Sequence, residues 1–91
     1  MEKLNTSEIE QALTSVPQWK KSGSEISRTY QFKDFMGAMR FVNSVAEIAE
    51  KAAHHPDIDI RWNKVTLTLT THDANGLTAK DFELAKQVDR L

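Results

Sequence analysis

The chain has 91 residues, with 12 lysines and arginines against 13 aspartates and glutamates, and no cysteine. This length predicts one domain over residues 1–91. A domain this small leaves much apolar surface exposed, and association of copies would bury more of it, so we expect a homodimer or homotetramer. The balanced charge argues against nucleic-acid binding. The lack of cysteine excludes disulfides and a thiol nucleophile and fits a reducing compartment. Because no apolar run indicates a signal peptide or a membrane span, we expect a cytoplasmic protein with no membrane contact.

The N-terminal third predicts a helix followed by a β-hairpin. Side chains at positions 5–8 can cap a helix over about Thr6–Leu13, where apolar residues follow at helical spacing. A strand-like stretch then begins at Trp19, breaks at positions 22–24 and resumes with apolar residues at even positions. Arg28 interrupts that alternation, which weakens the hairpin signal.

A long central helix is predicted next, with Asp34 as its cap. Its apolar residues keep to one stripe with steps of three and four. Phe41 and Ile48 lie off this stripe, one heptad apart, as either two partly exposed hydrophobic residues or a contact between subunits. The stripe consists of Phe35, Ala38, Met39, Val42, Val45, Ala46, Ala49, Ala52 and Ala53.

The second half predicts another hairpin and a last helix. Residues 57–62 alternate as a strand, Asn63-Lys64 makes a tight turn, and residues 65–70 form a second strand. A turn at Asn75-Gly76 precedes a capping box, Thr78 with Asp81, which opens the helix. The order helix-strand-strand-helix-strand-strand-helix predicts an α+β fold, a four-stranded antiparallel sheet with three helices packed on one face.

All three histidines fall between positions 54 and 72. Imidazole titrates closest to neutral pH among the side chains, so clustered histidines suit proton transfer in both directions. Because proline disfavours helical backbone in the preceding residue, Pro56 should end the central helix near His54 and turn His55 into an extended conformation. Both rings can then face one cleft, with Glu50 placed to hydrogen-bond His54 and with His72 closing the cleft from the sheet side.

Simpler interpretations of these histidines stay open. His54 and His55 also fit cations stabilised by a helix C-terminus, and His72 fits an ordinary loop residue. Three histidines together with Asp57 and Asp59 are also consistent with a zinc site, although neither HExxH nor paired cysteines are present.

Asp81 and Trp62 have structural interpretations as well. The third residue of a capping box is structural in most helices, and its carboxylate should stay ionised beside free amides. A tryptophan on a strand usually lies in the core. The residues alone therefore indicate a proton-transfer or metal site whose substrate is unknown.

Several of these residues stand at characteristic intervals, namely Glu50-x3-His54-His55-Pro56, then Trp62, His72 and Asp81. This pattern resembles the signature of the pterin-4a-carbinolamine dehydratase family. The flanking stretches 61–65 and 70–78 are similar to the same family, so the resemblance covers nearly the whole chain.

The resemblance implies a hydro-lyase that converts 4a-hydroxytetrahydropterin to quinonoid dihydropterin in tetrahydrobiopterin recycling, with no metal and no cofactor. An aromatic amino-acid hydroxylase, whose by-product is the substrate, is an implied partner. A non-catalytic protein-binding module with the same fold is the alternative, and three intact histidines favour the enzyme. The implied catalytic residues are His54, His55 and His72, and the implied substrate-binding or orienting residues are Glu50, Pro56, Trp62 and Asp81.

Overall fold

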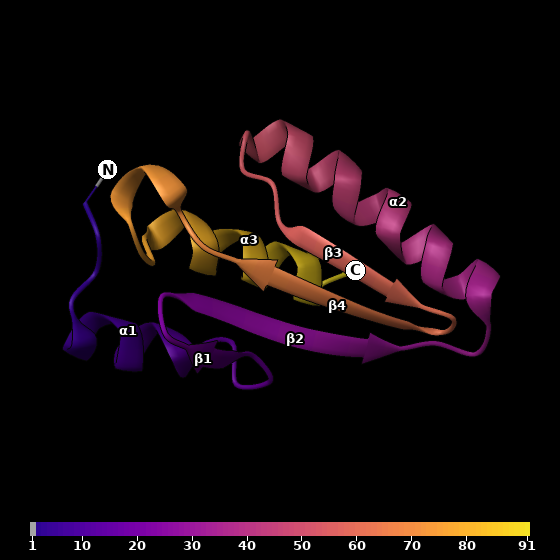
Figure 1. Ribbon diagram of the computed structural model, residues 1–91, viewed down its shortest axis with the longest axis horizontal. Helices are drawn as coiled ribbons and strands as arrows, with labels where there is room; N and C mark the ends of the chain where they lie inside the picture. The colour runs from indigo at the N-terminus through magenta and orange to yellow at the C-terminus, as the bar shows by residue number, and fades with distance from the viewer. Residues whose placement is uncertain (1) are drawn as a thin grey trace.

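Four antiparallel strands in the order β1-β2-β4-β3 form the sheet of the computed structural model, which describes residues 2–91 (Figure 1). The order of helices and strands is the predicted one, which confirms the α+β class. Within the described residues, no helix is long and apolar enough to cross a membrane. The elements are α1 (Thr6–Leu13), β1 (Lys20–Ser22), β2 (Glu25–Gln31), α2 (Phe35–Ala52), β3 (Asp57–Arg61), β4 (Lys64–Leu69), a 3₁₀ helix η1 (His72–Ala74) and α3 (Ala79–Asp89).

The helices begin where the sequence predicts, because polar side chains cap their free amides. Asn5 and Glu8 form a reciprocal capping box at α1, with hydrogen bonds of 2.8 and 2.9 Å. The Asp34 carboxylate accepts a hydrogen bond from the amide of Gly37 at the start of α2. Each of these caps satisfies an amide that has no partner within its own helix.

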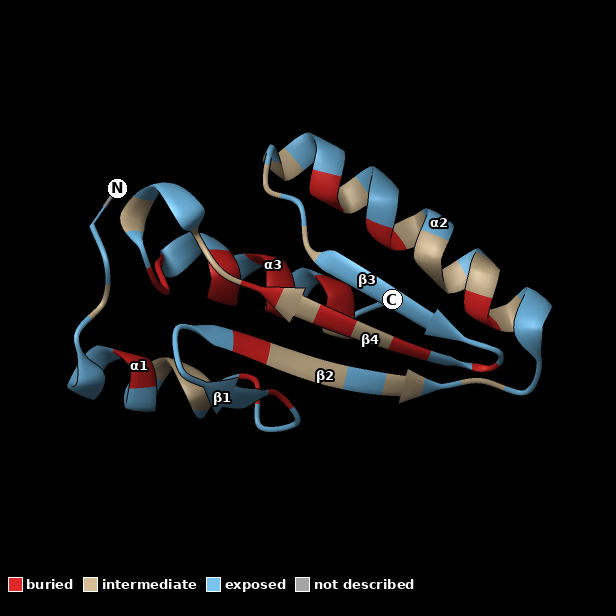
Figure 2. Ribbon diagram, in the orientation of Figure 1, coloured by how far each residue is buried: buried red, intermediate tan, exposed pale blue. Residues whose placement is uncertain are grey.

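One face of the sheet carries the core, as Figure 2 shows for the alternating burial along β4. Residues directly opposite each other in the pairing of β2 with β4, such as Ile26 and Leu69, share this face. Strand β3 differs, because all five of its residues are exposed. The fully buried side chains that helices and sheet contribute to the core include Val45 and Val88 from the helices and Ile26, Val65, Leu67 and Leu69 from the strands.

Arg28, which interrupts the alternation of β2, lies on the core face because it has a distant partner. Its Nη1 is 2.9 Å from Oδ1 of Asp89, near the end of α3. The same carboxylate accepts hydrogen bonds from the Trp19 indole at 3.0 Å and from the Tyr30 hydroxyl at 2.5 Å, and the Arg28 guanidinium lies over the Tyr30 ring. This network fixes the C-terminal end of α3 against the sheet.

Tyr30 gives this network a measurable pH dependence. Burial, and then its hydrogen bond to Asp89, raise the pKa of Tyr30 above its ordinary value of 10.0. The folded state therefore holds the phenolic proton more tightly than the unfolded state, and the resulting stability is complete below about pH 10 and is lost as the pH rises further. We expect the free energy of unfolding to fall more steeply above about pH 10 in the wild type than in Tyr30→Phe. Urea unfolding of both proteins across the alkaline range measures this, and parallel curves would contradict it.

The tight turn of the second hairpin is formed by Trp62 and Asn63, one residue earlier than predicted. Arg61 pairs with Lys64, and Trp62 takes a left-handed conformation with φ 50°, as two-residue hairpins require. Asn63 is buried instead, because its amide group donates to the Phe32 carbonyl at 2.9 Å. Trp62 consequently points away from the core and is 67% exposed, so the structural interpretation that places this tryptophan in the core does not hold.

The two residues off the stripe of α2 belong to the core of their own chain. Phe41 and Ile48 are half-buried and pack against the buried cluster. The Phe41 ring lies 4.6 Å from that of Tyr30 and 4.9 Å from that of Phe32, measured between ring centres. Phe41 is therefore an internal aromatic contact, and this pair does not form a free apolar face.

Candidate active site

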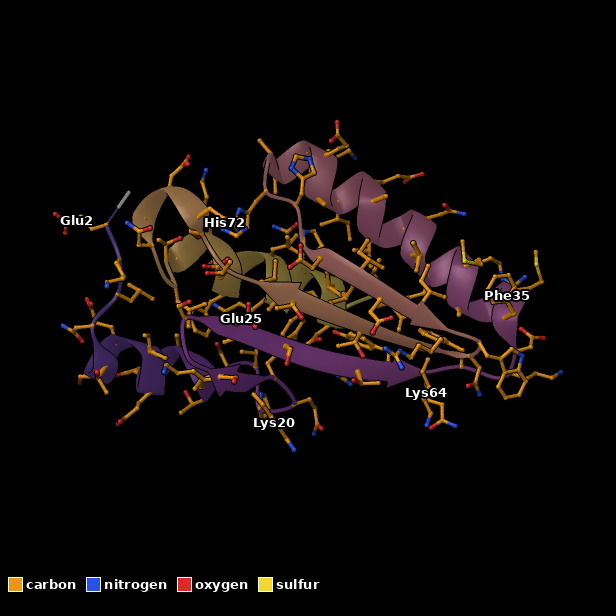
Figure 3. All side chains as sticks on the ribbon, viewed as in Figure 1. Glu2, Lys20, Glu25, Phe35, Lys64 and His72 are labelled. Carbon is orange, nitrogen blue, oxygen red and sulfur yellow. The ribbon has the colours of Figure 1, made fainter. Side chains whose placement is uncertain are left out.

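The end of α2, the start of β3, the end of β4 and the start of α3 meet at one end of the sheet (Figure 1). His72 lies at this end in Figure 3, while Phe35 and Lys64 lie at the opposite end. A cavity of about 280 Å³ opens here, whereas two hollows of about 340 Å³ along α1 contain no histidine. The cavity is lined by Ala53, His54, His55, Thr70, Thr71, His72, Asp73 and Lys80.

The end of α2 separates the two adjacent imidazoles. The helix ends at Ala52, slightly before the expected position near His54, because Ala53 adopts a left-handed conformation with φ 52°. The chain then leaves the helix axis, with the His54 amide still bonded to the Ala49 carbonyl. The His54 side chain turns inward and is 11% exposed, whereas that of His55 is 64% exposed.

Asp81 holds His54 from the first turn of α3. The carboxylate is fully buried, and its Oδ1 lies 2.6 Å from Nε2 of His54. Oδ2 accepts hydrogen bonds from the Thr71 hydroxyl at 2.8 Å and from the Thr78 amide at 2.9 Å. The predicted capping box is thus present, and the same carboxylate also orients an imidazole.

Glu50 pairs with His55 and not with His54, which corrects the expectation from helical spacing. Nε2 of His55 lies 2.7 Å from Oε1 of Glu50, and both side chains are largely exposed. The reason is the left-handed Ala53, which removes both histidines from the helical geometry on which the one-turn spacing depended. His55 therefore stands at the mouth of the cavity with a solvated carboxylate beside it.

His72 reaches the cavity from a 3₁₀ helix that the sequence pattern did not indicate. It is the first residue of η1, beyond the end of β4, and it is exposed. A bridge between Thr71 and Gly76 closes this segment, and Asn75 in a left-handed conformation with φ 58° makes the turn. Thr71 and Lys80 also line the cavity and were not predicted, although Lys80 is next to Asp81 in sequence.

None of the four predicted substrate-binding or orienting residues lines the cavity directly, and Asp81 reaches it only through His54. Trp62 lies in the turn at the far end of β3, a strand length of roughly 17 Å from its start. Pro56 is half-buried beside the cavity and Glu50 reaches it only through His55. Within residues 2–91, no three histidine, aspartate or glutamate side chains form a group that could hold a metal ion.

Residues 2–91 match the family model described as pterin 4 alpha carbinolamine dehydratase. The chain belongs to this family. A candidate pterin-4-alpha-carbinolamine dehydratase of Roseiflexus castenholzii is 56% identical over 97% of this chain and 95% of its own length. One from Acidobacterium capsulatum is 55% identical over 100% and 99% of the two chains. The resemblance predicted from the histidine pattern is confirmed, and with it the hydro-lyase class.

Two solved structures have the same fold as this chain. The crystal structure of a transcriptional coactivator/pterin dehydratase from Brucella melitensis is 36% identical and superposes with a TM-score of 0.94 over 98% of this chain and 97% of that chain. A pterin dehydratase-like protein identified as a RuBisCO assembly factor in the alpha-carboxysome shares the fold, with a TM-score of 0.66 at 19% identity over 79% and 83% of the two chains.

Proposed function

We propose that this chain converts 4a-hydroxytetrahydropterin to quinonoid dihydropterin and water in tetrahydrobiopterin recycling, and that His54, His55 and His72 carry out the proton transfers. Membership of the dehydratase family supports the reaction class. The substrate is a by-product of aromatic amino-acid hydroxylases, so an enzyme of that kind is the proposed source. A location in the cytoplasm, where the substrate would be formed, is part of the same proposal.

The chemistry calls for one acid and one base. The bond between C4a and the hydroxyl oxygen breaks, an acid protonates the departing hydroxyl to give water, and a base accepts the proton of N5 as the N5–C4a double bond forms. No electrons enter or leave, so the reaction needs no redox cofactor, and we propose that histidines supply both the acid and the base without a metal. Histidine suits both roles because it exchanges protons near neutral pH.

The observation that carries the proposal is the pairing of His54 with the buried Asp81 at the edge of a cavity that two further histidines line. A buried carboxylate beside an imidazole stabilises the imidazolium that forms when the ring accepts a proton. The cavity of about 280 Å³ is close to the lower end of ligand-pocket volumes. Its hydroxyl, carboxylate, ammonium and imidazole groups suit the many hydrogen-bonding atoms of a pterin ring.

The test is a direct assay of 4a-hydroxytetrahydropterin breakdown with the purified chain. We expect the carbinolamine to disappear faster than its uncatalysed decay, with quinonoid dihydropterin as the product. A decay rate that does not change with enzyme concentration would contradict the proposed function.

We also propose that two copies associate through the free edge of β3. The strand is at the border of the sheet, its five residues are exposed, and Ile58 and Ile60 are 38% and 36% exposed although they share the core face with β4. An unpaired edge with apolar side chains favours pairing with another strand. A second copy in antiparallel orientation, centred on Ile60, would place Asp59 opposite Arg61 and Ile58 opposite Trp62, which matches both charge and hydrophobicity.

A double substitution of this edge, Ile58→Lys with Ile60→Lys, tests the association. In this register the charges added at position 60 would face each other and the charge added at position 58 would face Trp62, so we expect the mass in solution to fall to a smaller multiple of the 10.4 kDa chain. Light scattering measures the mass. Phe35→Lys with Met36→Lys is the matched control, because these residues are also exposed and apolar but lie at the start of α2, outside the β3 edge. An unchanged mass in the β3 variant, or a monomeric wild type, would contradict the proposal.

A further inference from the structure

Thr71 stands immediately before η1, where a threonine hydroxyl ordinarily caps the free amides of the helix. It makes no such capping bond here. Its hydroxyl is 2.8 Å from Oδ2 of Asp81 instead, and 2.8 Å from the Thr78 hydroxyl. The Thr71 backbone is fixed by two hydrogen bonds with Gly76, which hold the side chain in place. Thr71 therefore gives its hydroxyl to the carboxylate that orients His54, and not to the local helix.

The direction of each hydrogen bond in this network follows from counting protons. The Thr71 hydroxyl has a single proton, which it donates to Asp81, so the Thr78 hydroxyl must donate to Thr71. The Thr78 oxygen in turn accepts from the amide of Lys80 at 3.3 Å. Every donor in this series of hydrogen bonds thus points toward Asp81. The Thr71 hydroxyl and the Thr78 amide both donate to Oδ2, which leaves Oδ1 of Asp81 to meet His54.

The contact of 2.6 Å between Nε2 of His54 and Oδ1 of Asp81 needs one proton, which we place on Nε2 because an imidazole is ordinarily a stronger base than a carboxylate. The other ring nitrogen, Nδ1, makes no hydrogen bond within residues 2–91. Every buried side-chain nitrogen or oxygen of these residues has a partner, so an unpartnered Nδ1 is not a buried atom. Nδ1 therefore reaches solvent. In the neutral ring it holds a free electron pair beside a buried negative charge, which are the properties of a proton acceptor.

We infer that Thr71 is a positioning residue for the reaction: its hydroxyl holds Asp81 so that His54 is fixed as the Nε2–H tautomer and exchanges protons with the pterin through Nδ1. The inference rests on the proposed function for its catalytic part. The charged and titratable groups that share the cavity with His54 are His55, His72, Asp73 and Lys80, with Glu50 bonded to His55. None of them has a hydrogen bond to Asp81 in the described residues.

The first measurement uses the wild-type chain and needs no activity. Nitrogen-15 NMR of the histidine rings distinguishes the two neutral tautomers, and we expect His54 as Nε2–H with a slowly exchanging ring proton. Finding the Nδ1–H tautomer would overturn the inference. Because this readout does not involve the pterin, it stands apart from the assay of carbinolamine breakdown. A chain without dehydratase activity but with the expected tautomer would reject the proposed function and keep the structural part of the inference.

The second measurement removes only the hydroxyl of Thr71. In Thr71→Val we expect faster exchange of the His54 ring proton and about a tenfold loss of kcat with a smaller change in KM, because Asp81 loses one of its donors. Thr71→Ser keeps the hydroxyl and should restore both readouts. Thr29→Val is the matched control, since Thr29 forms a hydroxyl pair with Thr66 at 2.8 Å on an exposed part of the sheet. Wild-type kcat and ring exchange in Thr71→Val would overturn the inference, as would an equal loss in Thr29→Val.

Discussion

Replacing His54 or His72 by alanine should lower kcat by roughly 10²- to 10⁴-fold, the usual contribution of a positioned acid or base. Both side chains line the cavity, and only His54 has a buried carboxylate partner. The double variant should lose less than the product of the two single losses if the histidines act as one unit. Steady-state kinetics on the three proteins measure these effects, and circular dichroism checks that each one is folded.

His54→Gln is the control that separates hydrogen bonding from proton transfer. His54→Ala leaves the buried Asp81 carboxylate without one of its donors, so its loss of activity alone does not distinguish lost proton transfer from lost stability. The glutamine amide can still donate to Asp81 but does not exchange protons near neutral pH. We expect it to recover stability without recovering kcat. Wild-type kcat in any folded variant of His54 or His72 would contradict the assignment of the site.

The sequence predicted those parts of the fold that depend on neighbouring residues. The caps at Asn5, Asp34 and Thr78 lie within three residues of the groups they bind, so their patterns are local. Arg28 is a counterexample. Its place on the core face depends on Asp89, which is 61 residues away in sequence, and no local pattern indicates that partner.

The candidate site shows the same division. The three histidines were found because their residue type and spacing are visible in the sequence, and the cavity does bring them together. The pairing of Glu50 with His55 was not predicted, since one residue in a left-handed conformation, Ala53, changes which side chains are neighbours. Thr71 was missed because its role depends on a hydroxyl turned away from its own helix.

Asp81→Asn should lower both the stability and the activity of the enzyme, because the fully buried carboxylate receives donors on both oxygens. An asparagine offers one oxygen and one amino group in their place. If the amino group replaces Oδ2, it meets the Thr71 hydroxyl and the Thr78 amide, which are both donors. If it replaces Oδ1, it forces the proton of His54 from Nε2 to Nδ1. We expect a cost of about 1–3 kcal/mol in unfolding free energy, the typical cost of an unsatisfied buried group.

The kinetic effect of the same substitution distinguishes a cap from a catalytic support. A ring forced to carry its proton on Nδ1 no longer presents a free electron pair there, so kcat/KM should fall by tenfold or more, which corresponds to at least about 1.4 kcal/mol of transition-state stabilisation. Glu8→Gln is the matched control, because Glu8 occupies the same position in the capping box of α1 and is exposed. It should cost at most about 1 kcal/mol and leave the kinetics unchanged. Melting temperature and kcat/KM measured on one Asp81→Asn preparation distinguish the two roles of Asp81. A lower melting temperature with wild-type kinetics would show that Asp81 only caps α3, because a cap acts on the helix and not on the tautomer of His54.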